Sequence, residues 1–217
     1  GWNKAWLDCM NRPLFYPAYS APSEYIHAFF KDISDRNPFP FPAELRAELE
    51  RYPGIHQPVG ESQSWKWLES FMGTRGRNYQ RHISKPLLSR ESSSRISPYL
   101  AWGNMSIRQV YGFVNNHSAK AEAPRAYASF LTRLRWNAHF IQKFEMEPEY
   151  ELQCVNRGYE LMSYSNRPDF LEAWKQGCTG VPLVDACMRC LEATGWINFR
   201  MRAMLVSFLC HHLDCDW

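Results

Sequence analysis

The sequence predicts an all-α fold, and three kinds of observation lead to that expectation. Apolar residues recur at the three- to four-residue spacing of an amphipathic helix over several long stretches. Helix start and stop signals frame these stretches, with serine, asparagine or proline at the beginnings and glycine at an end. No stretch alternates apolar and polar residues as a half-buried strand would, and no internal repeat or low-complexity tract is present.

The first 59 residues are rich in proline and aromatic side chains, and closely spaced prolines block long elements. Short helical patterns remain at residues 24–33 and 43–52. We therefore expect residues 1–59 to be connecting chain with short helices, leading into a helical domain at residues 60–217.

The first long helix of that domain is expected just after residue 60, where Trp65, Leu68 and Phe71 fall on one face. A second helix should begin at Ser106, because Ser106 and Gln109 have the spacing of a capping box. Its expected apolar face consists of Ile107, Val110, Tyr111 and Val114.

Three further helices complete the predicted domain. Pro124 suits the first position of a long helix that continues to Phe144. Pro182 begins the next helix, which Gly195 ends, and Asn198 can cap the last one. The apolar positions of the three helices are Tyr127, Phe130, Leu131, Leu134, Ala138 and Ile141, then Val184, Met188 and Leu191, and finally Met201, Leu205, Phe208, Leu209 and Leu213.

Composition places the chain among ordinary globular proteins, with 45% apolar and 22% charged residues over 217 positions. The seven cysteines have irregular spacings and no signal-like leader opens the sequence, so we expect a reduced, cytoplasmic protein. No apolar run approaches the roughly 20 residues that cross a bilayer, so no membrane association is expected. The net charge of +3 is too small to indicate nucleic-acid binding by itself.

Positive charge is instead concentrated between residues 75 and 95, where Glu91 is the only acid among six arginines and lysines. Such a run often is a solvated basic loop. Here it leads directly into the serines of residues 92–97, and hydroxyls, backbone N–H groups and a guanidinium before a helix are the parts of a phosphate or diphosphate cradle. Neither a P-loop nor a Rossmann fingerprint is present.

Two other groups of residues invite chemical hypotheses. Cys187 and Cys190, and the Cys210–Cys215 segment with its two histidines, do not complete a zinc motif, and we predict no metal site. Arg200 and Arg202 lie on an otherwise apolar helix, where an unpaired charge would be costly. Their partner could be the carboxylate of Asp185 or a bound anion.

Three ordered blocks of sequence reveal a family resemblance. They are SRISPYLAWGNMSIRQ (94–109), WKQGCTGVPLVDACMRCLEATGW (174–196) and RMRAMLVSFLCHHLDCDW (200–217). Over residues 60–217 the chain resembles the all-α FAD-binding domain of the photolyase/cryptochrome family. The resemblance implies a truncated domain without the family's N-terminal α/β antenna domain, which would carry an antenna pigment, and without the acidic flavin loop that follows Trp217.

In relatives the serine stretch wraps the diphosphate of a U-shaped FAD, which implies that role for residues 93–97. Tyr79 matches a tyrosine on the same cofactor, and Arg202 would favour the anionic reduced flavin. Trp217 matches the middle tryptophan of the relay that re-reduces photoexcited flavin, and Tyr164 stands where its surface tryptophan is usual. The residues expected to bind FAD are Tyr79, Ser93, Ser94, Arg95, Ile96, Ser97, Trp196 and Arg202.

The resemblance also implies a surface for UV-damaged DNA, on which Trp136 would stack a flipped pyrimidine dimer. Three positions depart from repair enzymes: Arg133 replaces a glutamate, Asn137 an arginine and Phe199 an asparagine. The residues expected at DNA are Arg81, Arg133, Trp136, Asn137, Phe199 and Arg200.

These features support two functions that both need FAD. One is a light-driven lyase that repairs pyrimidine photoproducts, and the other is a cryptochrome-type photoreceptor that signals to a partner without repair. A helical DNA-binding remnant without cofactor is the third possibility. We expect a monomer, and we expect residues 1–217 alone to bind FAD weakly or not at all and to repair nothing.

Overall fold

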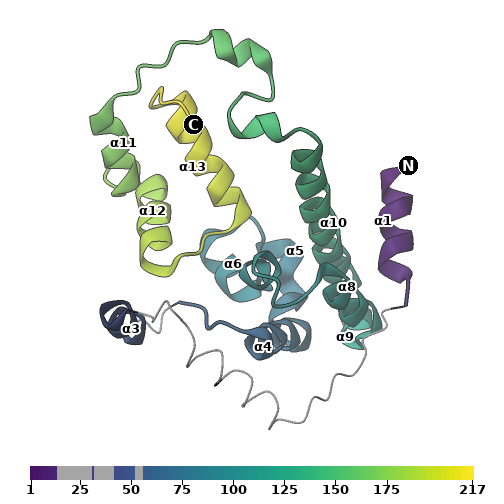
Figure 1. The fold of residues 1–217 in the computed structure, drawn as a ribbon. Helices are drawn as coiled ribbons and strands as arrows, with labels where there is room; N and C mark the ends of the chain where they lie inside the picture. The colour runs from purple at the N-terminus through teal and green to yellow at the C-terminus, as the bar shows by residue number, and fades with distance from the viewer. Residues whose placement is uncertain (14–30, 32–41, 52–55) are drawn as a thin grey trace.

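The computed structural model describes residues 1–13, 31, 42–51 and 56–217, and all regular structure in these ranges is helical, as predicted (Figure 1). The α-helices are α1 (Trp2–Asn11), α3 (Ala43–Glu50), α4 (Glu61–Gly73), α5 (Tyr79–His82), α6 (Pro86–Ser92), α7 (Ser97–Ala101), α8 (Ile107–Asn116), α9 (Ala119–Glu122), α10 (Pro124–Met146), α11 (Pro168–Lys175), α12 (Pro182–Thr194) and α13 (Phe199–His211). Three 3₁₀ turns are η1 (Arg75–Asn78), η2 (Pro148–Glu151) and η3 (Arg157–Leu161). The helix predicted at residues 24–33 lies outside the described residues.

The predicted helix start signals and the glycine stop signal are confirmed, whereas α10 ends at Met146 instead of Phe144 and α3 ends at Glu50 instead of residue 52. The capping box of α8 is complete, because Ser106 accepts from the Gln109 backbone and the Gln109 side chain accepts in return. Pro124 begins α10 at a position where its missing N–H costs nothing. Gly195 ends α12 with a φ of 65°, a left-handed conformation that glycine adopts without strain, and the Asn198 side chain caps α13.

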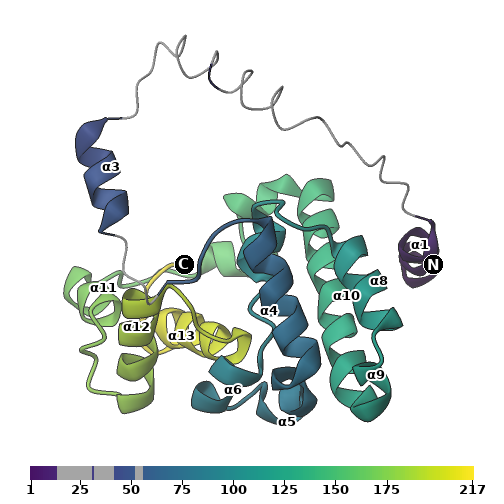
Figure 2. The same ribbon diagram turned by 90° about the horizontal axis from the view of Figure 1, so that it is seen from below.

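The basic run at residues 75–95 is not a loop but three short helical turns, η1, α5 and α6. Pro86 begins α6, which is a start signal that the density of charges hides. Figure 2 shows α5 and α6 below α4, at the lower edge of the view.

Most of the buried apolar residues in the described ranges gather in a large core formed by α4, α5, α7, α8, α9 and α10. Its centre is Phe71, which is 0% exposed and lies 4.9–5.7 Å from the rings of Tyr79, Tyr127 and Phe130. The rings of Tyr79 and Tyr127 meet Phe71 edge-to-face, an arrangement that adds to the free energy of burial. A side chain at Gly76 would place its Cβ 2.6 Å from the Phe71 carbonyl oxygen, so this close approach requires glycine.

A small core lies between α11, α12 and α13. Val184, Met188 and Leu205 are buried in it, and the Trp174 indole donates a hydrogen bond to the Leu205 carbonyl at 3.2 Å. Burial of aliphatic side chains at helical spacing is what the sequence pattern predicted for α12 and α13.

The two cores meet at α6. The Asn198 amide at the start of α13 donates to the hydroxyl of Ser89 at 2.8 Å, and both side chains are buried. Next to it, the Arg90 guanidinium contacts the Cys190 sulfur at 2.8 Å and the Trp196 carbonyl at 3.4 Å. Polar groups that are buried together must bond to each other, so these contacts set the register of the two cores.

The N-terminal helix α1 packs beside α8. Trp6 is buried and meets the ring of Tyr111 edge-on at 5.3 Å. Arg108 of α8 donates to the backbone carbonyl of Arg12 at 2.7 Å. The start of the segment expected to be connecting chain, residues 2–12, is therefore held against α8 of the helical domain.

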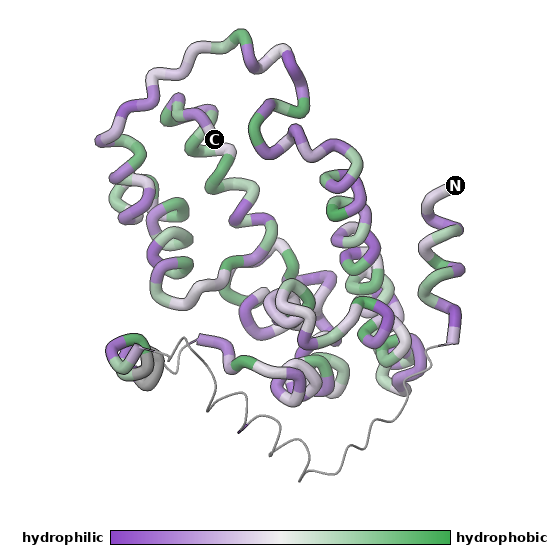
Figure 3. The backbone as a smooth tube through the Cα atoms, in the orientation of Figure 1, coloured by the Kyte–Doolittle hydropathy of each residue, from purple (hydrophilic) through white to green (hydrophobic). Residues whose placement is uncertain are grey.

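The second half of α10 differs from the prediction. The pattern placed Ile141 on the core side, but Ile141 is 50% exposed, and Phe140 and Phe144 are similarly open. The described helix therefore buries only its first half, around Tyr127 and Leu134. Hydrophobic positions alternate with hydrophilic ones along the exposed half (Figure 3). None of the described helices is both long and apolar enough to span a bilayer.

We predict that Asn198→Ala lowers the free energy of unfolding by about 2 kcal/mol, about half from the lost cap and half from the lost buried hydrogen bond. Asn198→Ser keeps a capping oxygen but cannot reach Ser89, so its loss should be about half as large. Urea denaturation measures both. Equal losses in the two variants would mean that the cap contributes nothing.

Candidate functional site

The serine-rich segment forms a concave turn between α6 and α7. Arg95 has a left-handed φ of 62° and Ile96 follows with φ −90° and ψ −5°. A left-handed residue next to a right-handed one aims successive N–H groups at a common point, which is the geometry of an anion-binding nest. Within the described chain, no backbone N–H from Ser94 to Ser97 donates a hydrogen bond.

The serine hydroxyls of this turn are equally available. Those of Ser93, Ser94 and Ser97 make no hydrogen bond to any residue that the structure describes, whereas Ser92 is paired with His82 at 2.7 Å. The Arg75 side chain fixes the turn from below by donating to the Ser93 carbonyl at 2.5 Å. The turn therefore presents donors without protein acceptors, as an oxyanion site requires.

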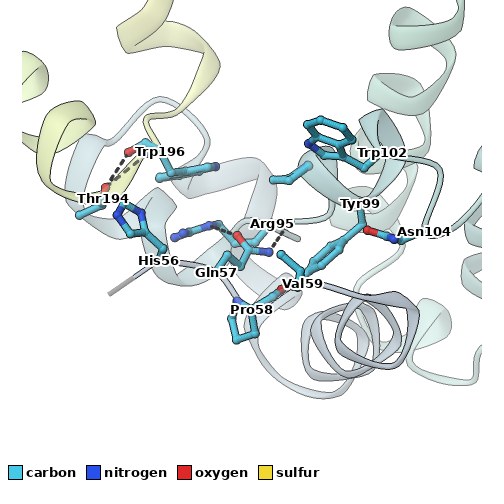
Figure 4. Close-up of a pocket in the computed structure, with 12 residues that line it drawn as sticks. His56, Gln57, Pro58, Val59, Arg95, Tyr99, Trp102, Asn104, Thr194 and Trp196 are labelled. Atoms are coloured by element: carbon cyan, nitrogen blue, oxygen red, sulfur yellow. Dashed lines mark hydrogen bonds between the residues drawn. The ribbon is translucent and has the colours of Figure 1, made fainter. Parts of the chain in front are cut away.

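The Arg95 side chain leaves this turn and faces a separate cavity of about 480 Å³. Its guanidinium lies 4.3 Å above the ring of Trp196 and 5.6 Å from that of Trp67, and its Nε donates to Gln57 at 3.2 Å. Figure 4 shows Arg95 between Trp196 on one side and Trp102 with Tyr99 on the other. None of the serines of the turn lines the cavity.

Three arginines gather here without a carboxylate. Burial, together with the positive charges of Arg90 and Arg75, lowers the pKa of Arg95 to about 10. No ion pair neutralises any of the three within residues 1–13, 31, 42–51 and 56–217. Cation–π stacking on tryptophan partly offsets their desolvation, and the region keeps an excess of positive charge.

Arg200 and Arg202 require a correction. We expected an anionic partner because both lie on an apolar helix, but both side chains are exposed on α13 and need none. The Asp185 carboxylate instead accepts from the Thr179 hydroxyl at 2.6 Å and from the Gly180 N–H. The hypothesis of an ion pair with Asp185 is wrong, because the pattern of α13 leaves its arginine positions facing solvent.

Tyr79 lies in the large core, with 7% of its surface exposed. Burial raises the pKa of its phenol to about 12, although the nearby charge of Arg133 opposes the shift. The phenol is therefore neutral at physiological pH. Tyr79 is not among the residues that line the Arg95 cavity.

The residues expected at DNA are all on the surface except for the partly buried Arg133. On α10 the Arg133 guanidinium lies 4.4 Å above the ring of Trp136, and Asn137 beside it is exposed. Phe199 is 61% exposed at the start of α13. Among the six residues expected at DNA, the structure brings only Arg133 and Trp136 into contact with each other. The other four are exposed: Arg81, Asn137, Phe199 and Arg200.

Tyr164 and Trp217 are brought together by hydrogen bonds between their neighbours. Backbone N–H groups of Ser165 and Asn166 bond to Asp214, and Asn166 in turn accepts from the Asp216 N–H at 2.6 Å. Both aromatic side chains line one cavity of about 360 Å³.

Partial desolvation is the main cause that raises the pKa of Tyr164, followed by the charges of Cys154 and Asp216. A phenol that is protonated before oxidation must release a proton when it loses an electron. Tyr164 can therefore serve as a donor only with a proton acceptor, which the exposed cavity provides as solvent or carboxylate.

All seven cysteines are free thiols. Cys187 packs in the small core as a buried apolar residue. In the described ranges, no three side chains among histidine, cysteine, aspartate and glutamate come together as metal ligands.

Several residues at the site escaped sequence reasoning. Gln57 lies in the segment expected to be connecting chain, and Trp67 belongs to a helix whose apolar face was assigned to the core. The basic run did indicate positive charge near the serines, but no local pattern distinguishes Arg90, which joins two helices, from Arg77, which is exposed.

Residues 130–217 match a family model described as the FAD binding domain of DNA photolyase. A deoxyribodipyrimidine photo-lyase of Alkalihalophilus pseudofirmus is 33% identical over 159 residues, which are 73% of this chain and 32% of that protein. The chain thus spans about a third of the length of the curated relatives that it matches.

Solved structures agree with this match. A class III photolyase from Agrobacterium tumefaciens superposes with a TM-score of 0.70 at 23% identity, over 94% of this chain and 39% of that one, which shows the fold. A cryptochrome from Synechocystis sp. PCC6803 gives a TM-score of 0.65 at 28% identity, over 73% of this chain and 33% of that one.

Proposed function

The chain belongs to the photolyase/cryptochrome family, and from that premise we propose that it is part of a flavin-dependent protein that repairs UV photoproducts in DNA under blue light. The observation that carries the proposal is the turn at residues 93–97, with its unpaired N–H groups and hydroxyls. A diphosphate is the anion that fits such a row of donors.

The residues present fit FAD in two further ways. The uncompensated charges of Arg75, Arg90 and Arg95 give the region the positive potential that a dianionic diphosphate needs. Arg202 is exposed and available to stabilise negative charge on the ring system. When bound, reduced FAD supplies the light-excited electron that splits a pyrimidine photoproduct.

The remaining contributions come from side chains of this chain. Trp136, 44% exposed on α10, offers an aromatic face to an extrahelical base. Tyr164 and Trp217, joined at one cavity, would pass an electron inwards from the surface. Exposed cations such as Arg81 and Arg200 would bind DNA phosphates, so binding would weaken with salt.

One observation favours a cryptochrome-type photoreceptor as the second candidate. Arg133 covers a face of Trp136 at 4.4 Å, and it stands where repair enzymes carry a glutamate. A base could stack on that face only after Arg133 moves away. A photoreceptor would keep the flavin and the relay without using this surface for repair.

We predict that Ser97→Asp lowers flavin affinity of the full-length protein at least about tenfold, because like charges about 4 Å apart repel by about 4 kcal/mol at a protein surface. Ser97 is exposed at the first position of α7, where an acid suits the helix dipole, so folding should not suffer. The measurement is the flavin-to-protein absorbance ratio. Ser62→Asp, at an exposed position in the first turn of α4, is the control, and an unchanged ratio in Ser97→Asp would remove the turn from the site.

Repair and sensing separate in one assay. The flavin-loaded, chemically reduced full-length protein is illuminated with single- and double-stranded oligonucleotides that contain pyrimidine dimers. We expect illumination to restore the ultraviolet absorbance of intact thymine bases. Normal flavin photoreduction without this recovery would support the photoreceptor and contradict repair of dimers.

Tyr164→Phe should slow flavin photoreduction in the full-length protein at least about tenfold while leaving flavin content unchanged, because phenylalanine cannot be oxidised in place of the phenol. Flash photolysis measures the rate. Tyr159→Phe, at the same cavity, is the matched control. Identical kinetics in Tyr164→Phe and the unaltered protein would exclude Tyr164 from the relay.

A further inference from the structure

The proposed function assigns no ligand to the cavity beside Arg95, although Arg95 and Trp196, two residues expected at FAD, line it. It opens between the segment at residues 56–59, the start of α7 and the turn that ends α12. Its volume of about 480 Å³ lies within the range of small-molecule sites. Because the serines of the 93–97 turn do not line it, it is a second concave site next to the first.

The first argument for a ligand is the state of the Arg95 guanidinium. Its Nε donates to Gln57, but its two terminal nitrogens donate no hydrogen bond to any described residue. Stacking on Trp196 holds the plane of the group and leaves its edge towards the cavity (Figure 4). A fixed, planar pair of donors with excess positive charge around it matches a bidentate oxyanion such as phosphate.

The second argument is Trp102, at the rim of the same cavity. Its side chain is 85% exposed, although tryptophan usually buries most of its large apolar surface. The described structure gives Trp102 no ring partner, so its faces are open to a planar ligand. Asn104 lies beside it, and its side-chain amide makes no hydrogen bond to a described residue.

We propose that this cavity binds a nucleotide, with the phosphate on the terminal nitrogens of Arg95 and the base stacked on Trp102. The Asn104 amide, which can both donate and accept, would contact an edge of the base. A free mononucleotide and a nucleotide within a DNA strand share this chemistry. We expect both parts of the ligand to be needed, because a phosphate alone would contact Arg95 without Trp102, and a base alone would stack on Trp102 without Arg95.

The test is calorimetric titration of the flavin-loaded full-length protein with adenosine monophosphate. Adenosine and inorganic phosphate are titrated separately, and each should bind at least about tenfold more weakly than the nucleotide. A hexamer of deoxythymidylate tests the second source. Tighter binding of the hexamer that is weakened in Trp102→Ala assigns the site to DNA, and tighter binding of the mononucleotide assigns it to a free nucleotide. No binding of the mononucleotide, with hexamer binding either absent or unchanged in Trp102→Ala, overturns the proposal.

Variants locate the site. Trp102→Ala and Arg95→Gln should each weaken nucleotide binding about tenfold or more. The matched controls are Leu161→Ala, which removes another exposed apolar side chain, and Arg77→Gln, which removes an exposed arginine of the same basic run. Circular dichroism confirms the fold. Unchanged affinity in Trp102→Ala would overturn the proposal.

Flavin content distinguishes this site from the flavin site. Trp102→Ala should lose nucleotide binding and keep its flavin, because Trp102 has no place in the 93–97 turn. If flavin and nucleotide are lost together, the cavity belongs to the flavin site and the second site does not exist. Loss of flavin in Ser97→Asp with retained nucleotide binding would support two separate sites.

Discussion

The buried contact between Ser89 and Asn198 is the constraint on which the arrangement depends. The Asn198 side chain caps α13 with its oxygen and reaches α6 with its amide nitrogen, so one residue both begins a helix and docks it. Arg90, the next residue of α6, holds the turn between α12 and α13. The short helix α6 thereby fixes the small core against the large one. It also ends in the serine turn, so the position of the turn follows from the packing of both cores.

The cluster of arginines around Trp67 and Trp196 shows how the molecule keeps cations together without acids. All three guanidiniums stack on tryptophan, and each has a further neutral partner: backbone carbonyls for Arg75, the α12–α13 turn for Arg90 and Gln57 for Arg95. None of these contacts cancels charge, because carbonyls and indole rings are neutral. The resulting positive potential acts on both concave sites at once, which accounts for two candidate anion sites within a few residues of each other.

Most of the fold could be predicted because its boundaries are encoded locally. A capping box at Ser106, a proline at residue 124 and a glycine at residue 195 each act through the adjacent backbone alone. The exposure of Ile141 and Arg202 could not be predicted in this way, since it depends on which elements pack nearby. The same holds for the site. The serine turn was visible as a cluster of hydroxyls, but the approach of Gln57 to Arg95 joins residues 38 positions apart.

The left-handed conformation of Arg95 has a consequence for the coupling of the two sites. The left-handed conformation costs a residue other than glycine roughly 1–2 kcal/mol, so the turn would relax if nothing opposed this strain. Contacts to both parts of the residue oppose this relaxation: the Gln57 amide donates to the Arg95 backbone carbonyl, and two indoles stack on the guanidinium. The backbone conformation of the serine turn therefore depends in part on the Arg95 side chain, which extends into the neighbouring cavity. A ligand that displaced the guanidinium would therefore also act on the backbone of the turn.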